Sequence, residues 1–152
     1  MKLNDNEIQE LKLLLQDKYI SVQKHPVYEL FIYKYTPNAV FEKKWIELTM
    51  RMRGMVLDND YNIIANCMPK FFNYDELEVL GISLPNEDYV VTKKMDGSLI
   101  EVFRYKGKII VSSAGSFSSP QSIAAENMLK TKYSHLLEYI EEGKTYIFEL
   151  IF

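Results

Sequence analysis

The sequence has little cysteine, no long apolar run and little net charge, and each absence excludes a class of protein. Cys67 is the single cysteine in 152 residues, so a disulfide framework and a cysteine-based zinc site are both excluded, and a reducing, cytoplasmic setting is expected. No apolar run approaches the roughly 18 residues that a membrane-spanning helix needs. The first residues also lack the apolar stretch of a secretory signal.

The charges nearly cancel. Eighteen Lys and Arg against 21 Asp and Glu give a net charge of −3 and a pI near 5.5. This excludes binding of nucleic acid through bulk positive charge, although it leaves room for a local basic groove. The content of 47% hydrophobic and 13% aromatic residues excludes a disordered chain, and 152 residues suffice for one domain with a real core.

Periodicity and turn signals predict an α+β fold with mostly antiparallel sheets and flanking helices. An amphipathic helix is expected from Asp5 to Lys18, with Asn4 or Asp5 as its N-cap. Residues 41–50 are ambiguous and could form a short helix that leads into a strand. Further helices are expected at residues 73–80, 119–132 and 135–142. Strands are expected at residues 19–23, 28–33, 53–57, 62–66, 89–93, 98–105, 108–113 and 145–152.

Residues 92–99, Thr-Lys-Lys-Met-Asp-Gly-Ser-Leu, carry the strongest chemical signal. The amine of Lys94 would be a nucleophile at neutral pH if it were partly desolvated or lay close to other cations. Gly97 would let the backbone approach a phosphate, and Asp96 could hold a metal or its bound water. A charged hairpin turn explains the same residues, and from these residues alone it is the more frequent structure.

Other short elements occur along the chain in a fixed order around residues 94–98. They are Met-Arg-Gly-Met at 52–55, Lys-Phe-Phe-Asn at 70–73, Ala-Gly-Ser-Phe at 114–117 and Phe-Glu-Leu at 148–150. Together they resemble the RNA ligase 1 family of T-even phages, a branch of the covalent nucleotidyltransferases. In that family, residues 94–98 correspond to motif I (K-x-D-G) and residues 148–150 to motif III. The resemblance covers residues 28–152.

The resemblance implies the adenylation fold of a nucleotidyltransferase, an ATP-grasp-like ligase. It implies that Lys94 attacks the α-phosphorus of ATP to give a lysyl-AMP, that AMP passes to the 5′-phosphate of an RNA, and that a 3′-hydroxyl then displaces AMP. ATP and Mg²⁺ are the implied cofactors. The implied partner is RNA with 5′-phosphate and 3′-hydroxyl ends, such as cleaved tRNA, during RNA repair in a bacterial or phage-infected cell.

The resemblance also assigns roles to single residues. The residues that it makes catalytic are Lys94, Asp96 and Glu149. The residues that it makes nucleotide-binding are Arg53, Lys70, Lys94, Gly97 and Glu149, and it leaves the metal ligands open. From their pattern alone, Arg53 and Lys70 would be solvated charges beside strands, and Glu149 would lie on the polar face of an edge strand. Phe148 could belong to an adenine pocket or to the core, Phe71 and Phe72 are expected in the core, and Asn73 is expected to cap a helix.

The sequence departs from the family pattern at two places. Ala114 stands where relatives have a basic residue before Gly-Ser. Motifs IV and V are absent, so residues 1–152 are expected to be the N-terminal part of an adenylyltransferase domain, truncated after motif III. The alternative hypothesis is therefore a non-catalytic or split fragment that binds nucleotide or RNA, with a second chain that supplies motifs IV and V. A capping-type or DNA-ligase-type enzyme is less favoured, because the Arg-Gly and Lys-Phe-Phe-Asn elements precede motif I.

Overall fold

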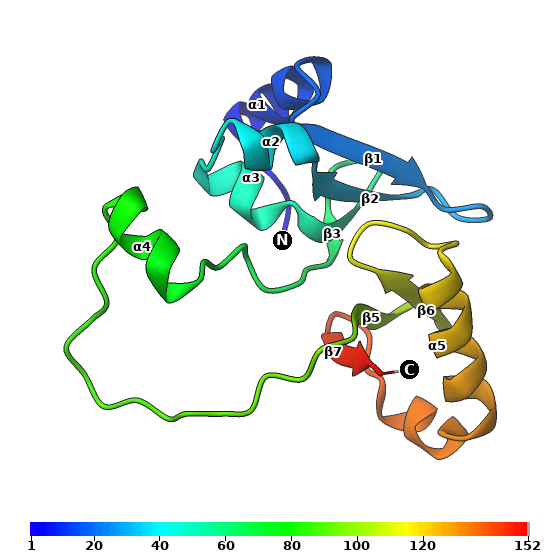
Figure 1. Cartoon of the computed structure of the whole chain (residues 1–152). Helices are drawn as coiled ribbons and strands as arrows, with labels where there is room; N and C mark the ends of the chain where they lie inside the picture. Colours follow the sequence, from blue (N-terminus) through cyan, green and yellow to red (C-terminus); the bar gives the residue numbers. More distant parts are fainter. Residues whose placement is uncertain (152) are drawn as a thin grey trace.

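The computed structural model describes residues 1–151, apart from the side chain of Val79, and contains two antiparallel sheets (Figure 1). The strands of the first sheet, in spatial order, are β1 (Ile20–Lys24), β2 (Leu30–Tyr35), β3 (Arg53–Asp58) and β4 (Ile63–Ala65). The strands of the second sheet, in spatial order, are β6 (Lys108–Ser113), β5 (Ser98–Tyr105) and β7 (Thr145–Leu150). The α+β class with antiparallel sheets is confirmed.

The helices flank the two sheets, apart from the helix Tyr74–Leu80, which lies away from both sheets (Figure 1). They are α1 (Asp5–Gln16), α2 (Pro37–Phe41), α3 (Glu47–Arg51), α4 (Tyr74–Leu80), α5 (Pro120–Thr131) and the 3₁₀ helix η1 (Ser134–Tyr139). The expected cap of α1 is confirmed, because the side chain of Asn4 accepts from the Glu7 N–H and the Asn4 N–H donates to the Glu7 carboxylate. None of the described helices is long and apolar enough to cross a bilayer.

The two sheets pack face to face through a shared apolar core. Leu30, Ile32 and Val56 of the first sheet are buried in one cluster with Phe103 and Ile110 of the second. On the opposite face of the second sheet, α5 and η1 cover a separate cluster. Helices α1 and α3 pack against the first sheet in a third cluster. Side chains that alternate along β5 therefore point either toward the first sheet or toward α5.

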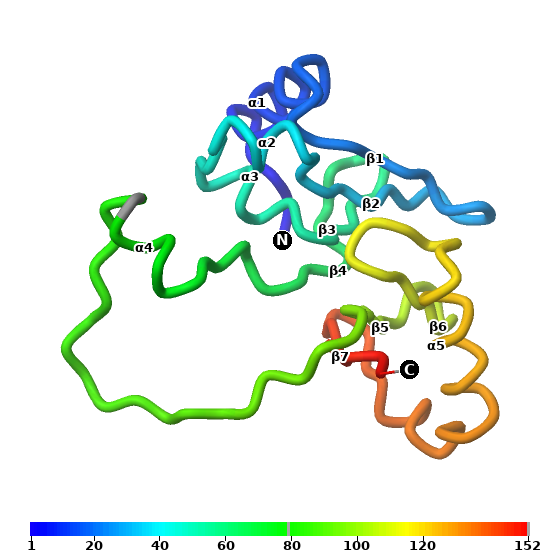
Figure 2. The backbone as a smooth tube through the Cα atoms, in the orientation of Figure 1, coloured from blue at the N-terminus to red at the C-terminus, as the bar shows by residue number. Residues whose placement is uncertain are grey.

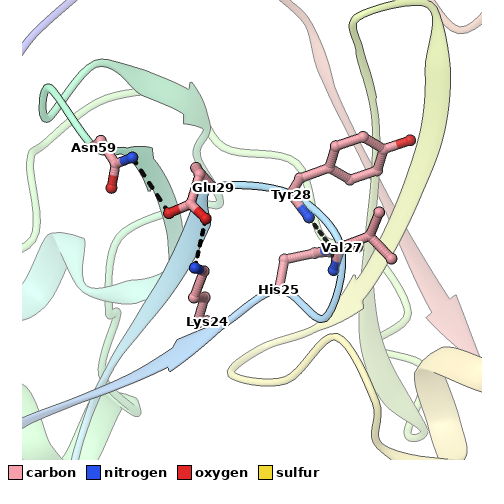
Figure 3. Close-up of polar contacts among 6 residues, drawn as sticks. All are labelled: Lys24, His25, Val27, Tyr28, Glu29 and Asn59. Carbon is pink, nitrogen blue, oxygen red and sulfur yellow. Dashed lines mark hydrogen bonds and ion pairs between the residues drawn. The ribbon is translucent and has the colours of Figure 1, made fainter.

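The hairpin between β1 and β2 is held by side-chain contacts (Figure 3). His25 Nδ1 accepts from the backbone N–H groups of Val27 and Tyr28 at 3.0 and 3.1 Å. Lys24 Nζ lies 2.5 Å from Glu29 Oε1. Burial lowers the pKa of His25, so the imidazole is neutral in the folded protein and can accept both hydrogen bonds.

The predicted strand at residues 89–93 is wrong. Residues 82–97 have no regular structure and follow a wide arc away from both sheets, between α4 and β5 (Figure 2). Tyr89, Val90 and Val91 favour strands, yet each is at least 84% exposed. A strand needs hydrogen-bond partners, and no described strand lies beside this segment to supply them.

Two further predictions need correction. Residues 41–50 contain no strand, because α2 and α3 are two short helices separated by a left-handed residue, Lys43 at φ 51°. The helix expected at residues 135–142 is only the 3₁₀ helix η1. 3₁₀ turns often serve as connectors, and η1 connects α5 to the segment that leads into β7.

Candidate functional site

Lys94 lies near the end of the long arc, close to the start of β5, and is exposed. Its Nζ is 2.5 Å from Asp96 Oδ1, and the two side chains are 76% and 89% exposed. The hydrogen bond to Asp96 and the charge of that carboxylate raise the pKa of Lys94, and the charge of Glu149 raises it further. The amine is therefore a solvated ammonium in this conformation, without the desolvation that would make it a nucleophile.

Gly97 brings the Lys94 loop against β7. A Cβ at Gly97 would lie 2.3 Å from the Leu150 carbonyl oxygen and 3.3 Å from Glu149 Cγ, so this approach requires glycine. Leu99 pairs with Glu149 across β5 and β7. The close approach that Gly97 permits is to the β7 backbone, and it places Glu149 beside the Lys94–Asp96 pair.

Arg53, at the start of β3, and Lys70 form a second group around the phenylalanine rings of the Lys-Phe-Phe element. The Arg53 guanidinium carbon lies 5.0 Å from the centroid of the Phe71 ring, and Lys70 Nζ lies 4.3 Å from that of Phe72. Lys70 Nζ also donates to the Phe71 carbonyl at 2.7 Å. Among the described residues, no hydrogen bond or ion pair joins this group to Lys94.

The aromatic residues of this element only partly follow the prediction. Phe71 is 55% exposed, so its prediction as a core residue is wrong. Phe72 is half-buried and packs edge-on against Trp45, with ring centroids 5.6 Å apart. Asn73 is the N-cap of α4, as predicted, and its N–H donates to Glu76 Oε2 at 2.8 Å.

Phe148 lies on the face of the second sheet that packs on α5, opposite to Glu149. It is 39% exposed and lines an apolar cleft of about 350 Å³ together with Ile100, Tyr133 and Leu150. Glu149 also lines this cleft, so the cleft adjoins the Lys94 group at β7. Phe148 is therefore part of the wall of an open cleft and is not a fully buried core residue.

Glu101 is a buried carboxylate that the sequence analysis missed. Its side chain points from β5 toward the first sheet, where a Cβ at Gly54 would lie only 1.9 Å from Glu101 Oε1. Burial raises the pKa of Glu101 to about 8, and the nearby charge of Arg53 opposes this shift. Within the described residues, both carboxylate oxygens and Arg53 Nη1 lack hydrogen-bond partners. A charged residue inside the apolar run Leu-Ile-Glu-Val-Phe was the signal available in the sequence.

The comparisons with known proteins identify the family of the region that contains both groups. The model of an RNA ligase family, of the T4 RNA ligase 1 type, matches residues 51–151 and so contains both groups. A predicted bifunctional polynucleotide kinase/RNA ligase of Autographa californica nuclear polyhedrosis virus is 23% identical in an alignment of 161 residues, and this alignment covers 90% of this chain. The chain spans only 23% of the length of that relative. Because the family match extends over about two thirds of the chain, the chain belongs to the RNA ligase family of the T4 RNA ligase 1 type.

Proposed function

We propose that residues 1–152 are the N-terminal part of the adenylyltransferase domain of an ATP-dependent RNA ligase, with Lys94 as the nucleophile. The observation that carries the proposal is the grouping of Lys94, Asp96 and Glu149 at the start of β5, inside the region that matches the family. Family membership supports an RNA substrate. The adenylylated lysine, the 5′-phosphate and 3′-hydroxyl ends, cleaved tRNA as substrate and a role in repair are parts of this proposal.

The proposed reaction begins with attack by the Lys94 amine on the α-phosphorus of ATP. The N–P bond forms as the bond to the bridging oxygen breaks, pyrophosphate leaves, and the ammonium proton is lost to solvent. The 5′-phosphate of RNA then displaces Lys94 from the phosphorus of AMP, and a 3′-hydroxyl finally displaces AMP. Every step is an in-line attack at phosphorus, so positioning and charge neutralisation supply most of the catalysis.

Lys94 must lose a proton before it can attack, and its pairing with Asp96 opposes this loss. The raised pKa of Lys94 shows that the pair stabilises the ammonium. Deprotonation becomes easier when Asp96 turns away from Lys94 and other cations approach the amine. Arg53 and Lys70 lie inside the matched region and are the cations that we propose to bind the phosphates. Arg53 in particular has a forked guanidinium that suits phosphate oxygens.

The carboxylates available for Mg²⁺ are Asp96 and Glu149. No group of three or more His, Cys, Asp or Glu side chains that could hold a metal occurs among the residues that the structure describes. Mg²⁺ is usually held by one or two carboxylates together with phosphate oxygens, so this pair fits a cation that arrives with the nucleotide. Such a cation would neutralise charge on the phosphates, and it would compete with Lys94 for Asp96.

A second candidate function is a nucleotide- or RNA-binding module without catalysis. The exposure of Lys94 and the raised pKa of its amine favour this candidate, because neither prepares the amine for attack. The binding groups, Arg53 and Lys70 over the aromatic rings, do not depend on the protonation of Lys94.

Incubation with α-labelled ATP and Mg²⁺, followed by denaturing electrophoresis, separates the two candidates. Wild-type protein is expected to retain the label through a covalent bond. Lys94→Ala should lose the label, while the neighbouring variant Lys93→Ala should keep it, since the Lys93 side chain forms no ion pair with Asp96 or Glu149 among the described residues. Wild-type protein that binds ATP but stays unlabelled would favour the binding module. In a parallel incubation with α-labelled GTP, label from GTP and not from ATP would favour capping chemistry.

A further inference from the structure

A tight turn after β6 lies directly against a lysine of the first sheet. Within this turn, residues 113–116, the Ser113 N–H donates to the Ser116 carbonyl at 2.9 Å. A Cβ at Gly115 would lie 2.6 Å from Lys34 Cδ and 3.3 Å from Lys34 Cβ. The missing side chain at Gly115 therefore lets the aliphatic stem of Lys34, from β2, lie along the turn.

Lys34 forms one wall of a cavity of about 320 Å³ beside this turn. It is the one charged side chain that lines the cavity, it is exposed, and it makes no ion pair with any residue described. The other polar side chains that line the cavity are those of Ser98, Ser113, Ser116 and Gln121. A wall with one cation, neutral hydrogen-bonding groups and no carboxylate is suited to an oxyanion.

Two of the neutral groups are available to a ligand. The Ser98 hydroxyl and the Gln121 side-chain amide have no hydrogen-bond partner in the described part of the chain. Ser113 and Ser116, in contrast, are engaged within the turn, where Ser113 Oγ donates to the Ser116 carbonyl at 3.3 Å. Lys34, Ser98 and Gln121 come from three different elements, so only the fold brings them together.

The cavity lies at the same end of the second sheet as the Lys94 group. Ser98 is the first residue of β5 and follows Gly97 directly. At this end of β5, Ile100 pairs with Ser113 on one side and with Phe148 on the other. The loop that carries Lys94 thus enters β5 between Glu149 on the β7 side and the Lys34 cavity on the β6 side.

We propose that Lys34 and the turn at residues 113–116 form a phosphate subsite for the nucleotide or RNA that reacts at Lys94. This inference rests on the proposed function. The turn itself, Ser-Ala-Gly-Ser, carries no cation, and Lys34 brings an ammonium to it from another strand. The ligand is a phosphate oxyanion, which either the triphosphate of ATP or the 5′-phosphate of RNA would supply, and Lys34 binds it without taking part in bond making.

The test compares the affinities of the full chain and its variants for two phosphate sources. The probes are ATP and a short single-stranded RNA, prepared once with a 5′-phosphate and once with a 5′-hydroxyl. Lys34→Ala removes the ammonium and Lys34→Arg keeps the charge. Lys12→Ala is the matched control, because Lys12 is an exposed lysine on α1.

We expect Lys34→Ala to weaken binding of one source by roughly tenfold, as for loss of one charge-assisted hydrogen bond, while Lys34→Arg restores most of the affinity. If ATP is the source, only its affinity falls. If RNA is the source, the loss depends on the 5′-phosphate, and the slope of log affinity against log salt should fall by about 0.7. Lys12→Ala should behave as wild type.

Equal affinities of Lys34→Ala and wild type for both probes would overturn the subsite, as would a wild-type chain that binds neither probe. Binding is measured without covalent chemistry, so the two proposals fail separately. A chain that is not labelled at Lys94 but loses phosphate affinity in Lys34→Ala would refute the reaction and keep the subsite. A labelled chain whose affinities do not depend on Lys34 would refute only the subsite.

Discussion

Glu101 makes the stability of the domain depend on pH in a direction that is unusual for a carboxylate. Its pKa is raised from 4.5 to about 8, because burial disfavours the charged form. The unfolded chain loses this proton near pH 4.5, whereas the folded chain keeps it up to about pH 8. Between these values the folded state binds more protons, so the free energy of unfolding falls as the pH rises.

The magnitude follows from the two pKa values. At about 1.4 kcal/mol for each pH unit, the difference between 4.5 and about 8 corresponds to at most about 5 kcal/mol, lost in full above pH 8. Rotation of the carboxylate toward Arg53 would reduce this loss. Glu101→Gln keeps the size of the side chain and removes the charge, so it should abolish this part of the pH dependence.

Thermal or urea unfolding at pH 5 and pH 8.5 measures the effect. We expect the Tm of Glu101→Gln to rise relative to the Tm of wild type between pH 5 and pH 8.5. For a domain of this size, the upper limit of this relative rise is roughly 10–20 °C. Glu10→Gln, at an exposed position of α1, is the matched control and should show no such gain. If the unfolding curves of wild type and Glu101→Gln shift in parallel with pH, Glu101 does not titrate as a buried group.

Three other perturbations test separate parts of the structure. Gly97→Ala should slow labelling of Lys94 by about 100-fold, because a Cβ placed 2.3 Å from the Leu150 carbonyl must displace the loop, and an unchanged labelling rate would refute this contact. Phe103→Ala, in the core shared by the sheets, should lower the free energy of unfolding by about 3–5 kcal/mol in urea, and a loss below about 1 kcal/mol would contradict the burial described. The lowered pKa of His25 keeps the folded imidazole neutral, so below pH 6.5 it should offset part of the gain in stability that Glu101 gives as the pH drops. In His25→Asn the stability should therefore rise more steeply as the pH drops below 6.5, and a slope identical to that of wild type would rule out this role of His25.

The elements that local signals determine were predictable from the sequence. The cap at Asn4 and the apolar spacing of α1 specify that helix, and the Lys106–Gly107 turn specifies the β5–β6 hairpin with its bounds. The strand predicted at residues 89–93 failed, because β propensity alone cannot supply a partner strand.

The candidate site was predictable only as a set of residues. The motifs identified Lys94, Asp96 and Glu149, and the structure shows how Gly97 brings their segments together. The protonation of Lys94 depends on which groups surround it in space, so the sequence could not reveal it. The same holds for Lys34, whose contact with the turn after β6 joins residues that are distant in the sequence.

In the proposed reaction Lys94 carries AMP, and peptide mapping by mass spectrometry shows whether it does. The full chain is incubated with ATP and Mg²⁺, digested under conditions that preserve a phosphoramidate, and searched for an adenylylated peptide. We predict one AMP on the peptide that contains Lys94, with the fragment ions assigning it to Lys94 and not to Lys93. AMP on another residue, or a chain that binds ATP and stays unmodified, would contradict the claim.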